Sequence, residues 1–228
     1  MQAQPTPAPE QLVRIVLRPY GSALPLGFFA FGFGTVLVAA LGLHWVPVDE
    51  GKIVAVTLLA FVAPLELIAC IFAFLSRDGA GGTSMGIFAA SWVAYALFLL
   101  TSAPGATSRT VGIFTAMECA VILELALVAI RGKPLLAILL VLAMIRSLCS
   151  ALHQFDPAVQ VYSLVSSAIG ILLGAFSLYG GIAFLMEDVN RRTILPLFRR
   201  GAAQDALEGD LGTQLRRITH EAGVRQQL

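Results

Sequence analysis

Residues 53–75 read IVAVTLLAFVAPLELIACIFAFL, and this stretch decides the fold. Glu66 is the only Asp, Glu, Lys, Arg or His that it contains. A hydrocarbon core roughly 30 Å thick demands a helix with about 18 or more consecutive apolar residues. Strands of a membrane barrel would instead alternate apolar and polar residues, and this stretch does not. We therefore predict that it crosses a membrane as a helix.

Five further runs of the same kind accompany it. The 228-residue chain is 57% hydrophobic and 13% charged, which excludes an ordinary soluble domain. Its net charge of +1 indicates no nucleic-acid partner. The composition predicts an all-α integral membrane protein, a six-transmembrane-helix bundle. Besides residues 53–75, the expected spans are residues 24–43, 85–102, 111–130, 135–152 and 159–186.

The connectors between these spans are short and rich in turn residues, such as residues 78–82 between the second and third spans. Lys and Arg near the span ends favour one side by nine to two, which predicts that both the N and C termini are cytoplasmic in a multi-pass protein of the cell (plasma or inner) membrane. The nine are Arg14, Arg18, Arg77, Arg131, Lys133, Arg191, Arg192, Arg199 and Arg200, against Lys52 and Arg109.

The chain thus divides into three parts. Residues 1–23 form a cytoplasmic N-terminal segment that we expect to be partly disordered, because its start is rich in Pro, Gln and Ala. Residues 24–186 form the six-helix transmembrane domain. Residues 187–228 form a cytoplasmic tail in which an apolar stripe at helical spacing predicts a short amphipathic helix, lying on the membrane or the bundle or binding a partner. The stripe is Leu207, Leu211, Leu215 and Ile218.

Four ionisable residues fall within the spans, and each is a candidate functional residue because charge is costly in lipid. At about 1.5 Å per residue, Glu118 and Arg146 lie about 10 and 9 Å below the outer ends of consecutive antiparallel spans, so we predict an ion pair between them. Glu66 and Glu124 lie about 20 Å below the outer surface, with no basic residue at that depth. They are either proton-titrating sites coupled to solute movement or neutral acids hydrogen-bonded between helices.

Small residues recur at helix-packing spacing in the first and last spans. Gly170 and Gly174 form a GxxxG motif, and Gly27, Gly32 and Gly34 lie in the first span. Such residues let helices approach closely, either within the bundle or between subunits. The sequence has no catalytic triad, nucleotide loop or metal-ligand cluster, so we expect neither an enzyme nor a cofactor.

Motifs at both ends of the bundle resemble one family. Residues 22–28 (SALPLGF), followed by residues 31–35 (FGFGT), resemble the first-span signature of the acetate uptake transporter family, which includes the succinate–acetate permease. That signature reads Asn-Pro-Ala-Pro-Leu-Gly-Leu and then Gly-Phe-Gly ending in Thr. Near the other end, Tyr179 and residues 192–196 (RTILP) are similar to the family's closing motif. The resemblance covers roughly residues 22–197.

This resemblance implies a six-span protomer, assembled as a hexamer with one pathway per protomer, that passes acetate and related monocarboxylates, with succinate in some members. Matched positions supply the substrate pathway. They are Ser22, Pro25, Leu26 and Gly27 in the first-span motif, Phe31 and Trp92 as walls of an apolar constriction, and Ala143 where a leucine completes it.

The sequence also departs from the family pattern. Ser22-Ala23 replaces the opening Asn-Pro, and Glu118, Glu124 and Arg146 occupy positions expected to be uncharged. The leading hypothesis is a passive or proton-coupled transporter or channel for small monocarboxylates. Two alternatives are a non-transporting membrane subunit or scaffold that retains the fold, and a channel for another small neutral solute.

Overall fold

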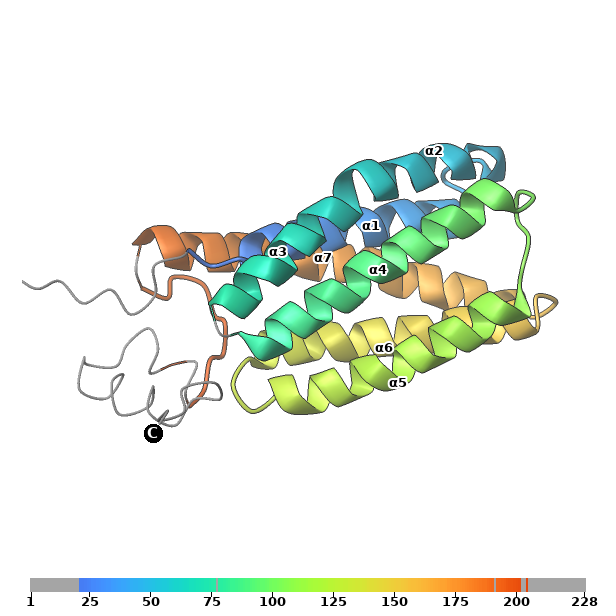
Figure 1. Ribbon diagram of the computed structural model, residues 1–228. Helices are drawn as coiled ribbons and strands as arrows, with labels where there is room; N and C mark the ends of the chain where they lie inside the picture. Colours follow the sequence, from blue (N-terminus) through green and yellow to red (C-terminus); the bar gives the residue numbers. More distant parts are fainter. Residues whose placement is uncertain (1–20, 77, 191, 202–203, 205–228) are drawn as a thin grey trace, which may run out of the picture.

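The computed structural model describes residues 21–76, 78–190, 192–201 and 204. Six helical spans, each long and apolar enough to cross a membrane, pack side by side, and the described residues contain no strand (Figure 1). The second span is a composite of four short helices. The elements are α1 (Leu24–Gly42), η2 (Val48–Glu50), α2 (Gly51–Thr57), η3 (Leu58–Val62), α3 (Ala63–Leu75), α4 (Gly79–Thr101), α5 (Arg109–Ala129), α6 (Pro134–Phe155) and α7 (Gln160–Asn190).

Both ends of the described chain lie at the same end of the bundle (Figure 1). There, the segment after α7 folds back until the Arg200 backbone N–H donates to the Gly132 carbonyl in the α5–α6 turn, at 3.1 Å. We call this the terminal end. The far end is the opposite one, where residues 43–50, 102–108 and 156–159 connect the helices. An even number of spans returns the chain to the side on which it started.

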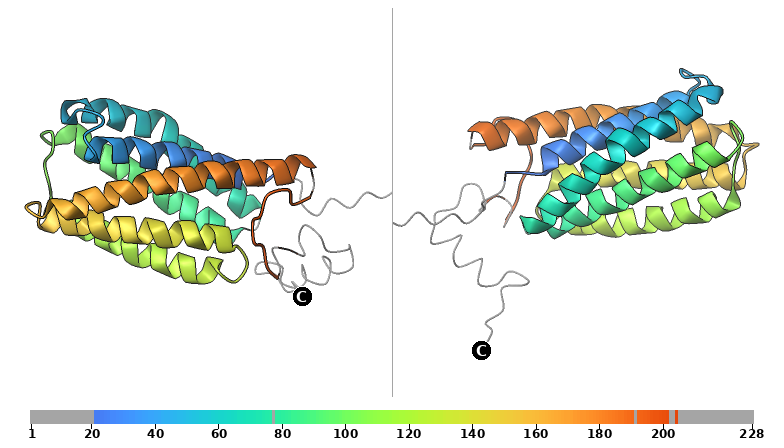
Figure 2. Two further views of the ribbon diagram at one scale, coloured as in Figure 1. Left: turned by 180° about the vertical axis from the view of Figure 1, so that it is seen from behind. Right: turned by 45° about the horizontal axis from the view of Figure 1, so that its top comes forward.

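Small residues allow α1 and α7 to pack closely along their length. A Cβ added to Gly170 would lie 2.8 Å from the Ala39 Cβ and 3.2 Å from the Thr35 carbonyl oxygen, closer than real contacts allow. The two helices run side by side in both views of Figure 2. The GxxxG motif of α7 therefore acts in packing within the protomer.

A π turn, η3, divides the second span. Pro64 follows it and has no N–H to donate to the carbonyl four residues earlier, so the regular α-helical ladder cannot pass through this point. The turn buries Val62 completely against α1 and α4. A Cβ added to Gly34 would lie 2.9 Å from both Val62 Cγ1 and Trp92 Cζ2, so only glycine fits between them.

The third span begins earlier than the sequence predicted. Residues 79–82, expected to belong to a connector, form the first turn of α4. The Asp78 carboxylate caps this turn by accepting the Gly81 N–H at 3.0 Å, which replaces one of the hydrogen bonds missing at a helix start. Gly82 packs against the Phe74 ring, so the turn is also held by burial.

The last span is longer than predicted, since α7 continues to Asn190. The segment after it crosses the terminal end and buries Leu197, which is 2% exposed. The expected disordered start of the N-terminal segment and the apolar stripe of the C-terminal tail lie outside the described residues.

Candidate functional site: a cavity at the far end of the bundle

A cavity of about 550 Å³ opens at the far end. Its rim is formed by loop residues, among them Asp49, Pro104 and Pro157, and its walls by α1, α4, α5, α6 and α7. The cavity is therefore continuous with the connectors of the far end and extends into the bundle between the helices.

Aromatic side chains close the inner end of this cavity. The Phe31 ring centroid lies 4.6 Å from that of Phe88 and 6.0 Å from that of Trp92. All three line the cavity, as does Ala143 on α6, and all four are buried. We call Phe31, Phe88, Trp92 and Ala143 the neck. Phe31, Trp92 and Ala143, the three residues expected to form a constriction, thus line one cavity.

Two opposite charges face the same cavity above the neck. Glu118 on α5 and Arg146 on α6 both line it and act on each other electrostatically. Among the ion pairs of the described residues, however, none joins them within 4.0 Å. The two residues predicted to pair are therefore neighbours across a cavity and are not directly bonded.

Each of these two charges has few partners within the protein. The Arg146 Cζ lies 6.0 Å from the centroid of the Trp92 ring, and its buried Nε has no hydrogen-bond partner in the described part of the chain. Beside the Glu118 carboxylate lie the hydroxyls of Ser91 and Ser147. The cavity thus holds a cation and an anion whose hydrogen-bonding capacity is largely unused.

Glu66 lies behind the neck rather than in the cavity. It is fully buried, and neither carboxylate oxygen has a hydrogen-bond partner among the described residues. The Trp92 indole N–H lies beside it without meeting hydrogen-bond geometry. Glu66 therefore contacts a residue of the neck while remaining shielded from the cavity.

Glu124 lies on the outer face of α5. It is exposed, as are its apolar neighbours Leu123 and Leu127, and it does not line the cavity. The structure therefore separates the two acids that the sequence placed at a common depth.

Residues of the first-span motif lie at the terminal end, away from the cavity. Pro25 and Gly27 are buried in the first turn of α1, and a Cβ on Gly27 would collide with the Met85 side chain. Ser22 precedes the helix, and its N–H approaches Asp188 Oδ1 at 3.5 Å, while Leu26 is partly buried against the core. None of these first-span residues lines the far-end cavity, and Leu24, Phe28 and Met85 of the buried core lie around them.

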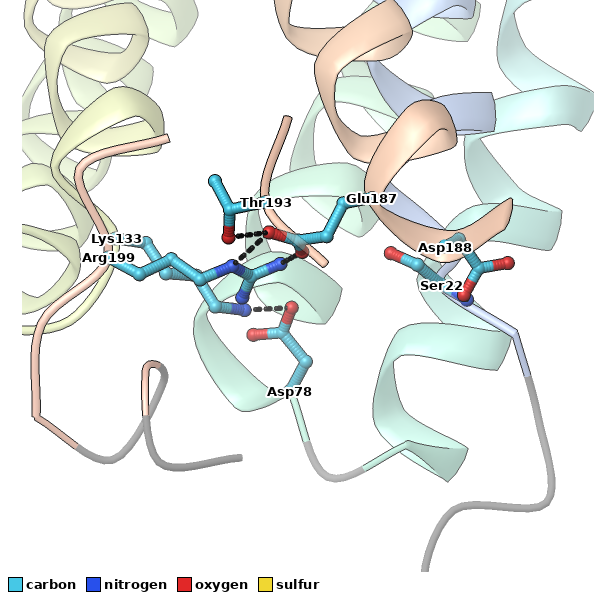
Figure 3. A network of polar contacts seen from close by, with 7 residues as sticks. All are labelled: Ser22, Asp78, Lys133, Glu187, Asp188, Thr193 and Arg199. Atoms are coloured by element: carbon cyan, nitrogen blue, oxygen red, sulfur yellow. Dashed lines mark hydrogen bonds and ion pairs between the residues drawn. The ribbon is translucent and has the colours of Figure 1, made fainter. Parts of the chain in front are cut away.

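A group of polar contacts that the sequence did not predict lies at the terminal end (Figure 3). Arg199 forms an ion pair with Glu187 through two nitrogens, and its Nε lies 3.2 Å from Glu187 Oε2. The Thr193 hydroxyl donates to the same oxygen at 3.1 Å. We call Glu187, Thr193 and Arg199 the latch. A second ion pair, Lys133–Asp78, joins the α5–α6 turn to the start of α4.

The sequence analysis also missed the hydroxyl groups that line the cavity. A periodic signal could have found them, because serines three and four positions apart share one face of a helix. On α6 this face also carries Arg146. The serines lining the cavity are Ser91, Ser102, Ser147, Ser150, Ser163, Ser166 and Ser167.

Comparisons with known proteins agree with this architecture. A solved structure of the bacterial acetate channel SatP superposes with a TM-score of 0.69 and 15% sequence identity, covering 78% of this chain and 99% of that one. That identity supports a shared fold. A search of curated proteins found no matching sequence. The model of the GPR1/FUN34/yaaH family matches residues 4–199. The chain is therefore a multi-pass membrane protein, and it belongs to the GPR1/FUN34/yaaH family, the acetate transporter family that its motifs resemble.

Proposed function

We propose that this protein passes small monocarboxylates of the acetate type across the cell membrane, through a pathway that begins in the far-end cavity. The observation that carries the proposal is the cavity itself. It holds a guanidinium group and ends on the neck formed by Phe31, Phe88, Trp92 and Ala143. The family and the fold that the chain shares with an acetate channel support it.

The neck favours an uncharged solute. A bare carboxylate would lose its hydration between Phe31 and Trp92, whereas a neutral acid loses much less. Arg146 attracts the anion into the cavity, and protonation there precedes passage through the neck. The cavity lining ends at the neck, so we propose that passage requires the terminal end to open.

We also place the terminal end in the cytoplasm. The excess of Lys and Arg at the span ends on that side supports this orientation. The cavity then faces the outside of the cell. Cysteine labelling of an introduced Ala106→Cys from outside intact cells tests the orientation, and labelling only after the cells are opened would reverse it.

Purified protein in liposomes tests the transport function directly. Labelled acetate should enter faster than into empty liposomes, and faster at acidic than at neutral pH, because more of the solute is neutral acid. Uptake equal to that of empty liposomes at both pH values would exclude this function and favour a non-transporting subunit. Competition by unlabelled formamide, a neutral amide, tests the remaining alternative.

Glu66 is our candidate for the proton site if flux is proton-coupled. A buried carboxyl group without a partner is far less costly with a proton than without one. Glu66→Gln keeps the shape of the neutral acid but cannot exchange a proton. We expect acetate equilibration down its own gradient to persist in this variant, while accumulation driven by an imposed proton gradient is lost. Accumulation equal to that of the parent would show that Glu66 carries no coupled proton.

Glu124 supports a homo-oligomer, the hexamer that the resemblance implies. An ionisable residue on an exposed apolar helix face is costly in lipid, so a neighbouring subunit is a better environment for it. Native mass spectrometry of the detergent-solubilised protein measures the assembly. A monomer under conditions that preserve bound lipid would contradict this proposal.

A further inference from the structure

We propose that the far-end cavity binds a small zwitterion, namely a carboxylic acid that also carries an ammonium group, such as a small amino acid. Arg146 binds the carboxylate and Glu118 binds the ammonium. The proposal deepens the function proposed above and rests on it only for the idea that the cavity belongs to a solute pathway. Binding itself is independent of transport.

Arg146 is suited to bind the carboxylate group of the ligand. A guanidinium offers donors in a planar fork that matches a carboxylate. The Trp92 ring, 6.0 Å from the Arg146 Cζ, lies against this side chain, while the buried Nε lacks a partner among the described residues. No carboxylate of the described chain lies within ion-pair distance of Arg146. A ligand carboxylate in the cavity supplies the missing acceptor.

Glu118 is suited to bind the ammonium group of the ligand. Its carboxylate faces the same cavity, with the hydroxyls of Ser91 and Ser147 beside it. An ammonium group has three donors and no acceptor, so it can bond the carboxylate and both hydroxyl oxygens together. A hydroxyl can accept from the ligand and still donate to the carboxylate, which leaves no polar group of this cluster unsatisfied.

The balance of charge favours a zwitterion over a simple anion. Glu118 and Arg146 together carry no net charge, so a bound acetate ion that gains from Arg146 is also repelled by Glu118. A zwitterion meets each group with the opposite charge and forms charge-assisted hydrogen bonds at both ends. A volume of about 550 Å³ leaves room for such a ligand together with water. The neck below offers it no paired charge, so we expect it to remain in the cavity.

A tryptophan in the site provides the readout. The chain has two tryptophans, and Trp45 is 67% exposed at the far end, so Trp45→Phe leaves Trp92 as the single reporter beside Arg146. This variant, purified in lipid nanodiscs at neutral pH, is titrated with glycine, acetate and methylammonium, with calorimetry as a second measurement. Glycine should bind roughly tenfold or more tightly than either single-charge probe, as one additional charged hydrogen bond implies. Acetate binding as tight as glycine binding, or no response to glycine by either method, overturns the proposal.

Variants of Glu118 and Arg146 test which residue binds each end of the zwitterion. Glu118→Gln should lower the ratio of the affinities for glycine and acetate roughly tenfold, and Arg146→Met should abolish binding of both. The matched controls make the same chemical changes outside the cavity: Asp188→Asn at the terminal end and Arg109→Met at the start of α5 should leave affinity unchanged. Monodisperse elution and an unchanged far-ultraviolet circular dichroism spectrum without ligand show that each variant is folded. Retention of the glycine preference in folded Glu118→Gln overturns the assignment of the ammonium end.

The transport assay separates this proposal from the function proposed above. Acetate uptake into liposomes without any preference for glycine in the binding assay overturns the zwitterion site alone. Tight glycine binding with no acetate uptake overturns the transport function alone. If both hold, glycine in the cavity should slow acetate uptake, because the two solutes share one entrance.

Discussion

The bundle contains two arginine–glutamate sets, one at each end, and the same residue types are used in opposite ways. At the terminal end, Arg199 and Glu187 are bonded through two nitrogens and supported by Thr193. At the far end, Arg146 and Glu118 face each other across a cavity without a direct bond.

The difference shows what each set can do. In the latch, each charge satisfies the other, so the set stabilises the closed terminal end and has little capacity left for a ligand. In the cavity, the charges are partly unsatisfied and reachable from the rim, so they can bind a solute. Removing the arginine should therefore affect stability at one end and binding at the other.

Breaking the latch should have the largest effect on stability. Arg199→Met leaves the Glu187 carboxylate, whose side chain is 5% exposed, without its cation. Loss of one partner from a buried ion pair costs about 3–5 kcal/mol. We expect a matching loss in the free energy of unfolding, measured by denaturant titration in detergent. Arg199→Met combined with Glu187→Gln should recover much of it, and a single variant as stable as its parent would show that the latch is not stabilising.

Filling the neck should have the next largest effect. Ala143→Phe adds a ring beside Phe31 and Trp92, and overpacking of this kind costs about 1–3 kcal/mol. Acetate uptake into liposomes should fall to the level of empty liposomes. Ile138→Phe, on the same helix at a site that is 43% exposed, is the matched control and should retain uptake. Uptake through folded Ala143→Phe at the parent's rate would place the pathway elsewhere.

Loosening the segment that carries the latch should have a smaller effect. The Tyr179 hydroxyl donates to the Pro196 carbonyl at 2.9 Å and so ties this segment to α7. Tyr179→Phe removes one hydrogen bond, worth about 0.5–1.5 kcal/mol. Amide hydrogen exchange should increase in residues 192–200 and stay constant in α5. Equal protection in both proteins would mean that the bond contributes nothing to closure.

Removing the cavity arginine should have the smallest effect on stability. Arg146→Met breaks no direct ion pair and removes a guanidinium whose buried Nε has no partner among the described residues, so we expect it to change the free energy of unfolding by no more than about 1 kcal/mol. The same denaturant titration used for Arg199→Met makes the comparison direct. A loss as large as that of Arg199→Met would show that the two sets play the same structural role.

The sequence predicted the bundle well because hydropathy is a property of individual spans. It also predicted an ion pair between Glu118 and Arg146, since depth and the pairing of antiparallel neighbours can be counted along the chain. The two residues line one cavity, but none of the ion pairs among the described residues joins them. Depth alone did not show that Glu124 faces away from the cavity. Helical periodicity would have shown it. Six residues beyond Glu118, Glu124 is rotated about 120° away from the cavity at about 100° per residue.

Other features depend on contacts that no local pattern contains. The latch joins residues on either side of the turn after α7, and its geometry depends on how that segment folds back over the bundle. The same applies to the cavity. Its volume results from the packing of five helices. Equal depth in the membrane also does not show whether Glu118 and Arg146 are in direct contact or lie apart across a cavity.

The π turn of the second span has a further consequence for chain length. Such a turn accommodates one residue more than an α-helix does over the same rise, so residues 58–62 act as an inserted residue absorbed within the membrane. Deleting Ala60 would remove this extra residue and would rotate residues 63–75 by about 100° relative to the start of the span. Glu66 would then turn away from Trp92. The direction in which Glu66 faces therefore depends on how many residues the π turn contains, and not only on the amino acids that surround Glu66.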